Sequence, residues 1–202
     1  MFDSSVHNKQ VCTFFQKVGA CRHGDKCVRT HVYPKHSRTI LFPKLYDNPK
    51  HVEESKRDDS GPSNPNPVIE SSLDETQTQQ RIDSLYKDIF IELALKYGPI
   101  EKMVICENVN PHLSGNVYVR FRDETDAMKC YKECNDRWYN GKPIFAELSP
   151  VTNLDDATCR LYDTNECDRG GMCNFIHERR ADSRLERDLF ASQRRLASER
   201  RY

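Results

Sequence analysis

The 202-residue chain has no long apolar run, no net charge of either sign and only one tryptophan. No apolar stretch approaches the roughly 18 residues that a membrane-spanning helix needs. The start of the sequence, from Met1 to Gln10, is polar and shows no secretory leader, so we expect no association with a membrane. The composition also excludes collagen, a coiled coil and full disorder. The length permits only one or two small domains.

The absence of net charge conceals an uneven distribution. Residues 1–46 carry eight Lys or Arg against two Asp or Glu, and residues 178–202 carry eight against five. Residues 47–148 carry 13 basic against 19 acidic side chains. A basic head and tail suit a polyanion, whereas an acidic middle suits a basic peptide. We therefore expect two kinds of partner.

Nine cysteines, an odd number, argue against a disulfide framework in a chain with no visible leader. Six of them form two clusters with the spacings C-x8-C-x5-C-x3-H and C-x7-C-x5-C-x3-H. Three thiolates and one imidazole complete the tetrahedral shell of Zn²⁺, which leaves no position for a catalytic water. The sequence therefore predicts two zinc sites, and metal binding must drive the folding of such short segments. The predicted ligands are Cys12, Cys21, Cys27 and His31 in the first cluster, and Cys159, Cys167, Cys173 and His177 in the second.

Aromatic and basic side chains accompany both clusters, and such side chains stack on unpaired bases or contact phosphates. Phe175 lies between Cys173 and His177, and Arg29 holds the equivalent place in the first cluster. Packing against the zinc site is the alternative for the aromatic residues, and for Phe15 both interpretations stay open. The candidate RNA-binding residues are Phe14, Phe15, Arg22, Lys26, Arg29, Arg160, Arg169 and Phe175.

Between the clusters, apolar periodicity predicts the element order β-α-β-β-α-β, which is that of an RNA-recognition motif. The stretch 48–80 is polar and is typical of a disordered insertion or a long loop. Strands are expected over 39–46, 100–106, 116–121 and 143–148, and helices over 82–97 and 124–134.

The predicted sheet departs from the pattern by which such a domain binds RNA. Base stacking requires aromatic residues on the two central strands, but Asn116 and Leu41 stand at two of the expected positions. Alternation leaves Tyr118 as the main ring on the sheet surface. We therefore expect this sheet to stack bases poorly and the domain to bind another ligand.

Two features of the middle domain point to a peptide ligand. Asp88 and Glu92 lie one turn apart on the first helix, beside Ile91 and Leu95, which point away from the core. The only tryptophan, Trp138, lies in an otherwise polar loop and is a natural interface anchor. A solvated helix face and a ring folded back onto the domain are the corresponding alternatives.

The layout of finger, degenerate RNA-recognition motif and finger resembles the small-subunit family of the U2 auxiliary factor, U2AF, of pre-mRNA splicing. The resemblance covers about residues 8–190, without most of the 48–80 loop. The stretches that carry it are GACRHGDKC (19–27), GNVYVRF (115–121), RWYNGKPIFAELSPVT (137–152) and RGGMCNFIH (169–177).

The motifs and the resemblance together predict an α+β chain, in which a ferredoxin-like RNA-recognition motif is flanked by two small CCCH zinc fingers. The expected parts are a first finger over 8–36, a central domain over 37–150 with the insertion at about 48–80, a second finger over 151–179 and a basic C-terminal helix over 180–202. Whether this helix covers the sheet, covers a finger or stays exposed is open.

The resemblance also implies a function. The central domain of that family holds a tryptophan-containing peptide of the large U2AF subunit, and the positions carried over are Asp88, Glu92, Arg137 and Tyr139, with Trp138 inserting reciprocally into the partner. The two fingers together would read the AG of the 3′ splice site in single-stranded pre-mRNA, in the nucleus and without catalysis.

Some features leave other interpretations open. Val28 and Leu161 replace residues that are often polar in the family, so the preference around the AG is expected to differ. A zinc-stabilised protein adaptor that reads no RNA is the alternative function. An enzyme is disfavoured, because Asp155 and Asp156 have no evident acidic cluster or nucleophile–base pair beside them.

Overall fold

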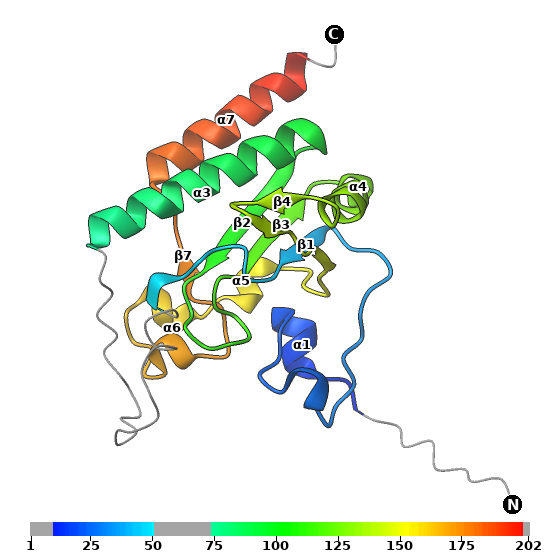
Figure 1. Cartoon of the computed structure of the whole chain (residues 1–202), viewed down its shortest axis with the longest axis vertical. Helices are drawn as coiled ribbons and strands as arrows, with labels where there is room; N and C mark the ends of the chain where they lie inside the picture. The colour runs from blue at the N-terminus through cyan, green and yellow to red at the C-terminus, as the bar shows by residue number, and fades with distance from the viewer. Residues whose placement is uncertain (1–9, 51–73, 200–202) are drawn as a thin grey trace, which may run out of the picture.

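The computed structural model describes residues 10–50 and 74–199, and its centre is a five-stranded sheet in the order β6-β1-β3-β2-β7 (Figure 1). All neighbouring strands are antiparallel. Their bounds are β1 (Thr39–Phe42), β2 (Ile100–Cys106), β3 (Val117–Phe121), β6 (Glu147–Leu148) and β7 (Glu178–Arg179). Strands β1, β2, β3 and β6, with one helix after β1 and one after β3, give the expected β-α-β-β-α-β order of an RNA-recognition motif.

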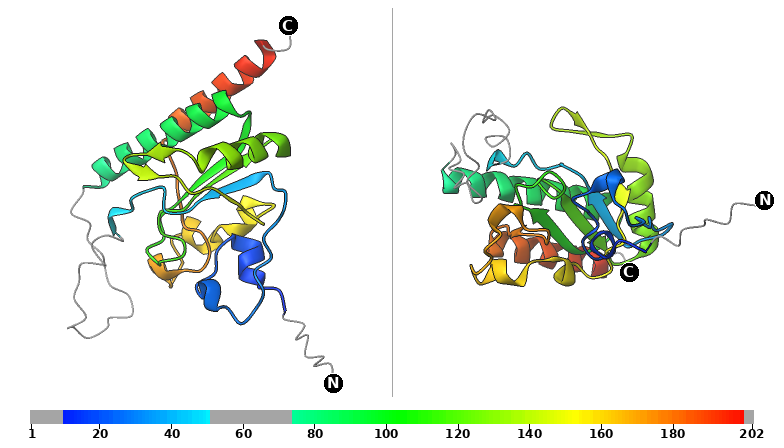
Figure 2. Two further views of the ribbon diagram at one scale, coloured as in Figure 1. Left: turned by 45° about the vertical axis from the view of Figure 1, so that its right-hand side comes forward. Right: turned by 90° about the horizontal axis from the view of Figure 1, so that it is seen from below.

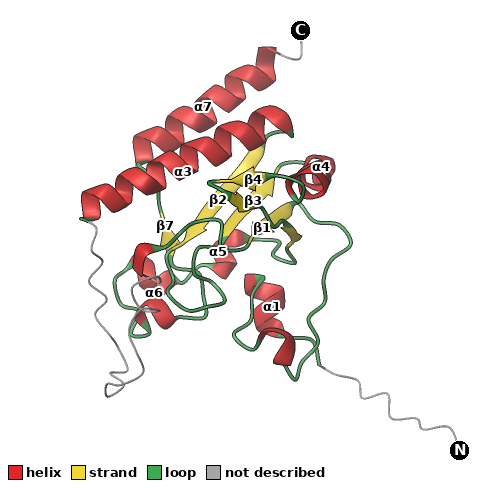
Figure 3. Cartoon of the chain, viewed as in Figure 1, coloured by secondary structure: helices red, strands yellow, loops and turns green. Residues whose placement is uncertain are grey.

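Two helices, α3 (Glu75–Lys96) and α4 (Glu124–Cys134), cover one face of the sheet. Figure 3 shows them on the side opposite the small helices of the fingers. Alternation along β1 and β3 directs the side chains of Ile40, Val117 and Val119 into this layer. They form the larger core of the molecule with the apolar stripe of α3, which includes Ile82 and Phe90.

The other face of the sheet is covered by the two fingers. The small helices on this side are α1 (Thr13–Val18), α5 (Leu154–Ala157) and α6 (Arg160–Asp163). A second core joins Leu41, Val104 and Tyr118 of the strands to Val18 and Ile176 of the fingers. The surface that stacks bases in an RNA-binding RNA-recognition motif is therefore closed to solvent here.

Tyr118 lies on the predicted face, but the prediction that it is exposed was wrong. Its side chain is fully buried, and its hydroxyl donates a hydrogen bond of 2.8 Å to the carbonyl oxygen of Val18. Gly19, which ends α1 with a φ of 77°, lets the finger approach closely, since a Cβ there would lie 2.7 Å from the Ser149 hydroxyl. The sequence pattern identified the face but not what covers it.

The chain returns to the sheet after the second finger, which the sequence did not predict. Strand β7 pairs with β2, so that Arg179 lies opposite Ile105. The last helix, α7 (Ser183–Glu199), then lies beside α3 in the views of Figures 1 and 2. The ring of Phe190 packs edge-on against Phe90, with ring centroids 4.9 Å apart. The expected C-terminal helix thus exists, but it covers α3 rather than the sheet or a finger.

Several predicted boundaries need correction. Helix α3 begins at Glu75, before the expected residue 82, and Asn48 is buried with its amide donating to the carbonyl of Glu107. The two ends of the expected 48–80 insertion therefore belong to the fold, and residues 51–73 lie outside the described residues. The expected last strand over 143–148 is divided between β6 and a hairpin of β4 (Trp138–Tyr139) and β5 (Lys142–Pro143).

Other expectations are confirmed. Strand β2 and helix α4 have the predicted bounds, and Cys106, Cys130 and Cys134 are buried in the core. Among the described helices, none combines the length and the apolar character needed to cross a lipid bilayer.

We predict that Tyr118→Phe lowers the free energy of unfolding by about 1–3 kcal/mol, because the buried Val18 carbonyl loses its hydroxyl donor. Urea denaturation of the zinc-loaded protein would measure this loss. Tyr33→Phe is the control, since Tyr33 is 59% exposed and lies two residues after the zinc ligand His31. Equal stability of the two variants would show that the hydroxyl does not hold finger 1 on the sheet.

Candidate zinc centres and nucleic-acid interface

The two predicted Cys₃His sets each come together in space, with all their ligand atoms within 4.8 Å of one another. The Sγ atom of Cys21 lies 3.7 Å from that of Cys12 and 3.9 Å from that of Cys27. Tetrahedral zinc with Zn–S bonds of about 2.3 Å requires sulfur atoms about 3.8 Å apart. In the second set, Cys159 and Cys167 place their Sγ atoms 3.7 Å apart. Both sets therefore have the dimensions of a zinc cage.

The histidines give an independent test of the fit. The Nε2 atoms of His31 and His177 are buried and find no hydrogen-bond partner within the part of the chain that the structure describes. Burial lowers the pKa of His177 to about 4, so that its imidazole is neutral at pH 7. A neutral imidazole is the form that binds a metal. The residues present fit zinc, whose role with four protein ligands is structural.

The two fingers repeat one local design. We name finger 1 residues 11–31 and finger 2 residues 158–177. In each, a parallel bridge joins the entering and leaving chain, between Val11 and Thr30 and between Thr158 and Ile176. A three-residue 3-10 turn precedes the third cysteine, at Gly24–Lys26 and Gly170–Met172. The zinc ligands thus hold equivalent positions on two matching backbones.

An aromatic ring stacks on the ligating histidine of each finger. Phe15 lies 4.4 Å from His31 between ring centroids, and Tyr162 lies 3.9 Å from His177, both nearly parallel. Phe15 is 6% exposed. Of the two interpretations left open for Phe15, the structure supports packing against the zinc site.

The fingers meet on one side of the molecule through their other aromatic residues. The rings of Phe14 and Phe175 have centroids 5.8 Å apart, and the Lys17 ammonium lies 5.2 Å from the Phe175 ring. Phe14 is 41% exposed and Phe175 is half-buried. The predicted stacking residues of the two fingers, 161 positions apart, thus form one shared apolar surface with a positive charge beside it.

A pocket opens on each side of this surface. One, of about 330 Å³, lies against finger 1 and extends to His112 and Asn174. The other, of about 470 Å³, lies against finger 2 and extends to Lys17. Four of the predicted basic residues line them, namely Arg22 and Arg29 in the first pocket and Arg160 and Arg169 in the second. All four are exposed, as is the fifth predicted basic residue, Lys26.

Finger 2 is fixed to the end of β2 by buried polar groups. The Asn108 amide donates to the carbonyls of Cys173 and Phe175, and its oxygen accepts from the backbone N–H of His177. Asn110 also donates to the Cys173 carbonyl, at 2.7 Å. Because two of the residues contacted, Cys173 and His177, are predicted zinc ligands, these hydrogen bonds set the orientation of the whole finger.

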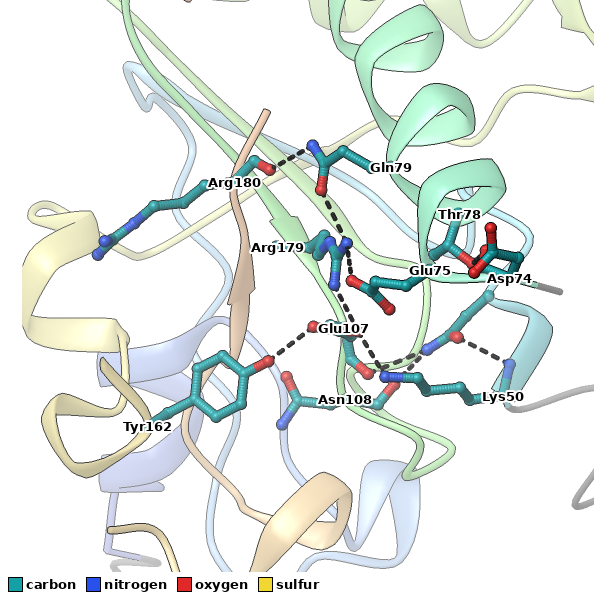
Figure 4. A network of polar contacts seen from close by, with 11 residues as sticks. Lys50, Asp74, Glu75, Thr78, Gln79, Glu107, Asn108, Tyr162, Arg179 and Arg180 are labelled. Atoms are coloured by element: carbon teal, nitrogen blue, oxygen red, sulfur yellow. Dashed lines mark hydrogen bonds and ion pairs between the residues drawn. The ribbon is translucent and has the colours of Figure 1, made fainter. Parts of the chain in front are cut away.

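Glu107 connects finger 2 to two other segments of the chain, as Figure 4 shows. Its carboxylate accepts from the Tyr162 hydroxyl at 2.6 Å and pairs with Lys50 at 2.7 Å and with Arg179 at 3.4 Å. Arg179 in turn bonds to Glu75 at the start of α3. Burial alone would raise the pKa of Glu107, but the hydrogen bonds from Lys50 and Tyr162 outweigh it, and the pKa lies below its usual value.

The five residues expected to bind the partner peptide come together on the opposite side of the sheet from the fingers. Arg137 pairs with Glu92 at 2.7 Å. Burial and the adjacent Asp88 carboxylate raise the pKa of Tyr139, which places this ring beside the acidic helix face. Trp138 between them is 70% exposed and does not fold back onto the domain.

The outer face of α3 continues this surface. Leu95 is 50% exposed and Ile91 is 38% exposed, as expected for residues that point away from the core. An apolar strip beside two carboxylates and an exposed tryptophan therefore stands free on the described part of the chain.

Comparison with known proteins adds family relationships to this geometry. Residues 87–144 match the model of the RNA recognition motif, and residues 8–33 match that of the C-x8-C-x5-C-x3-H zinc finger. The chain is 43% identical to the U2AF 23 kDa splicing factor subunit of Schizosaccharomyces pombe, over 93% of this chain and 80% of the relative. It belongs to the U2AF small-subunit family.

Two further relatives give the same result. The U2af 38 kDa subunit of Drosophila melanogaster is 41% identical over 95% of this chain and 69% of the relative. The human U2AF 26 kDa subunit is 40% identical over 96% of this chain and 84% of the relative. Among solved structures, the RNA-recognition motif of RNA15 aligns with 60% of this chain and 97% of its own at a TM-score of 0.30 and 13% identity.

Membership confirms the resemblance drawn from the sequence, together with the α+β fold and the zinc cofactor. The U2AF small subunits are splicing factors with an RNA-recognition motif and zinc fingers, and the family is not enzymatic. Asp155 and Asp156 lie on helix α5, where each pairs with a basic side chain, Lys102 and Arg160 respectively.

The sequence missed several residues that shape the site. Lys17, His112 and Asn174 line the two pockets, and Glu107 holds finger 2 through Tyr162. Tyr162 could have been found, because it follows Cys159 by the same three positions by which Phe15 follows Cys12. Lys17 and Asn174 belong to the fingers themselves, whereas His112 and Glu107 reach the fingers only through tertiary contact and carry no local pattern.

We predict that elemental analysis of the purified protein returns two zinc ions per chain. Cys21→Ser and Cys167→Ser should each lower this number by one, because each removes one thiolate from a different cage. Cys130→Ala, which removes a buried core thiol, is the control and should retain both ions. One zinc ion in the wild-type protein, or a loss in the control, would contradict the two-cage assignment.

Proposed function

We propose that this splicing factor recognises the AG at the 3′ splice site of pre-mRNA through its two fingers. In the same proposal, it heterodimerises with the large U2AF subunit through its central domain and acts in the nucleus. The observation that carries the RNA part is the contact of Phe14 with Phe175, which joins two basic pockets into one surface. The family relationship supports both parts.

The geometry of the fingers favours a short single-stranded RNA. Each pocket combines exposed arginines with an aromatic ring, and unpaired bases bind by stacking on such rings while arginines contact phosphates and base edges. Since the sheet face is occupied by the fingers, the RNA-recognition motif has no free stacking platform of the usual kind. Two adjacent pockets match a dinucleotide better than a long sequence.

Two positions that differ from the family's usual polar residues lie in these pockets. Val28 is 86% exposed in the pocket of finger 1, and Leu161 is 54% exposed in that of finger 2. Apolar side chains there contact a base without hydrogen-bonding it. We therefore expect the preference for the nucleotides that flank the AG to be weaker than in relatives with polar residues.

The central domain favours a basic, apolar peptide. Asp88 and Glu92 supply negative charge, Ile91 and Leu95 supply an exposed apolar strip, and Trp138 supplies an anchor that a partner can bury. The Glu92–Arg137 ion pair orients the loop that carries this tryptophan. The alternative function, an adaptor without RNA readout, shares this half of the proposal but leaves the exposed finger arginines without a role.

We predict that Arg29→Ala and Arg160→Ala each weaken binding to an AG-containing RNA about tenfold, as loss of one arginine contact does. Binding to the large subunit should not change. Filter binding at one fixed salt concentration would measure the RNA affinity. Arg122→Ala is the control, because Arg122 is exposed on the loop after β3. If neither finger variant differs from this control, the adaptor function is favoured.

We predict that Trp138→Ala weakens heterodimer formation by about 2 kcal/mol or more, as truncation of a buried interface tryptophan does. RNA binding by the isolated chain should be unchanged, since the fingers lie on the other face of the sheet. Isothermal titration calorimetry with the large subunit would measure the affinity. The matched control is Tyr33→Ala, which removes an exposed aromatic ring from the segment that follows finger 1. Unchanged affinity of the tryptophan variant would place the anchor elsewhere.

A further inference from the structure

Helix α7 presents four exposed arginines on the side that faces away from α3. Its inner side is fixed, because Gln193 bonds to both the N–H and the carbonyl of Ile100, and Phe190 packs against Phe90. At 100° per residue, the four arginines fall within an arc of about 100° on the outer side. We call them the arginine stripe, and its members are Arg184, Arg187, Arg194 and Arg195.

The stripe is long and keeps a surplus of positive charge. At 1.5 Å per residue, it extends about 17 Å along the helix. Asp188 and Glu199 lie along one flank of it, and Ala191 and Ser198 lie within it. Four guanidinium groups against two flanking carboxylates leave the outer surface of α7 basic, although the whole chain is neutral.

The arginines of the stripe differ from those that stabilise the fold. Arg38, Arg137 and Arg179 each form an ion pair with a carboxylate. By contrast, no member of the stripe forms an ion pair with any other residue that the structure describes. The same holds for Arg29 and Arg169 in the pockets of the fingers. The stripe therefore resembles the proposed RNA-binding surface and not the structural ion pairs.

The chemistry of the stripe favours a polyanion over a folded acidic protein. A protein interface needs an apolar centre that is buried on association, but the only large exposed apolar residue of α7 is Leu196, at the edge of the inner face. A phosphate backbone needs no such centre. The planar fork of arginine matches a phosphate in a bidentate geometry.

The position of α7 relates the stripe to the fingers. Ser183, the first residue of α7, follows the zinc ligand His177 by six positions, and only the short strand β7 intervenes. Figure 1 shows α6 of finger 2 and helix α7 on opposite sides of the sheet, joined by β7, which is the edge strand next to β2. An RNA strand that leaves finger 2 can therefore reach the helix only around this edge of the sheet, along the path that the chain itself takes through β7.

We propose that the arginine stripe is a second RNA-binding site, which contacts the phosphates of the pre-mRNA beyond the AG. This inference rests on the proposed function of the fingers. It assigns the stripe no sequence preference, because arginine–phosphate contacts carry none. Its effect is to lengthen the RNA that the protein binds and to steepen the dependence of binding on salt.

The test compares three RNAs with the full-length, zinc-loaded protein. One is a short AG-centred oligonucleotide that spans only the fingers, and the other two are the same oligonucleotide extended by uridines on its 5′ or its 3′ side. The wild-type protein should bind one extended RNA several-fold more tightly than the short one. Arg187→Gln/Arg194→Gln should lose this gain and bind the short RNA as before.

The salt dependence gives a second readout. Each phosphate contact on a single strand contributes about 0.7 to the slope of log K against log salt, so the double variant should lower that slope by about 1.4 for the extended RNA. Lys129→Gln/Lys132→Gln removes the same charge from the exposed side of α4 and should leave the slope unchanged. Because glutamine has a helix propensity close to that of arginine and lysine, both variants keep the helix.

The possible outcomes separate this inference from the proposed function. Equal affinity for short and extended RNAs, or an unchanged slope in the stripe variant, would overturn the stripe as an RNA site. Competition by poly-glutamate as strong as that by poly-uridine would assign the stripe to an acidic protein instead. If the short RNA failed to bind while an extended RNA bound, the proposed function of the fingers would be contradicted and the proposal for the stripe would not.

Discussion

The structure depends on the closure of two zinc cages, because only a bound metal gives the finger segments a fixed shape. Neither finger has enough apolar residues for a core of its own, and each completes its packing on the sheet. Val18 and Ile176 enter the core that contains Tyr118, so the order imposed by the metal extends to the face of the RNA-recognition motif. Because that face is covered, the sheet offers no platform for base stacking, and the proposed AG-binding surface lies on the outer side of the fingers instead. The site of the proposed function thus follows from what the zinc ligands hold in place.

Much of the molecule could be predicted from the sequence because the deciding patterns are local. Cysteine and histidine spacing identified all eight metal ligands, and apolar periodicity identified β2 and α4 with the bounds observed. The candidate peptide-binding residues also gather as expected, since Asp88 and Glu92 are one helical turn apart and Arg137 and Tyr139 belong to one short loop.

The errors concern residues whose environment is set by distant parts of the chain. Tyr118 has the alternation of a surface residue, yet its burial depends on Val18, 100 positions away. Strand β7 consists of two charged residues and has no strand pattern, so its pairing with β2 comes from the position of finger 2. Phe15 and Phe14 are neighbours in sequence and both aromatic, but the turn of α1 directs one toward His31 and the other toward Phe175. Tertiary packing decides the environment of each of these side chains, and local periodicity in the sequence does not report it.

Helix α3 links the two proposed binding surfaces to each other. One side of it is occupied along its length by α7, through Tyr86 with Glu186 and Phe90 with Phe190. Another side holds the acidic and apolar residues that stand free for a peptide, and the N-terminal end bonds through Glu75 to Arg179 and so to the Glu107 network beneath finger 2. A buried carboxylate that lost its cationic partners would be costly. The ion pairs of Glu107 therefore oppose any movement of finger 2 relative to α3. The proposed peptide surface and the proposed RNA surface are then parts of one frame and lie on its opposite faces, so that two ligands would not compete for one site.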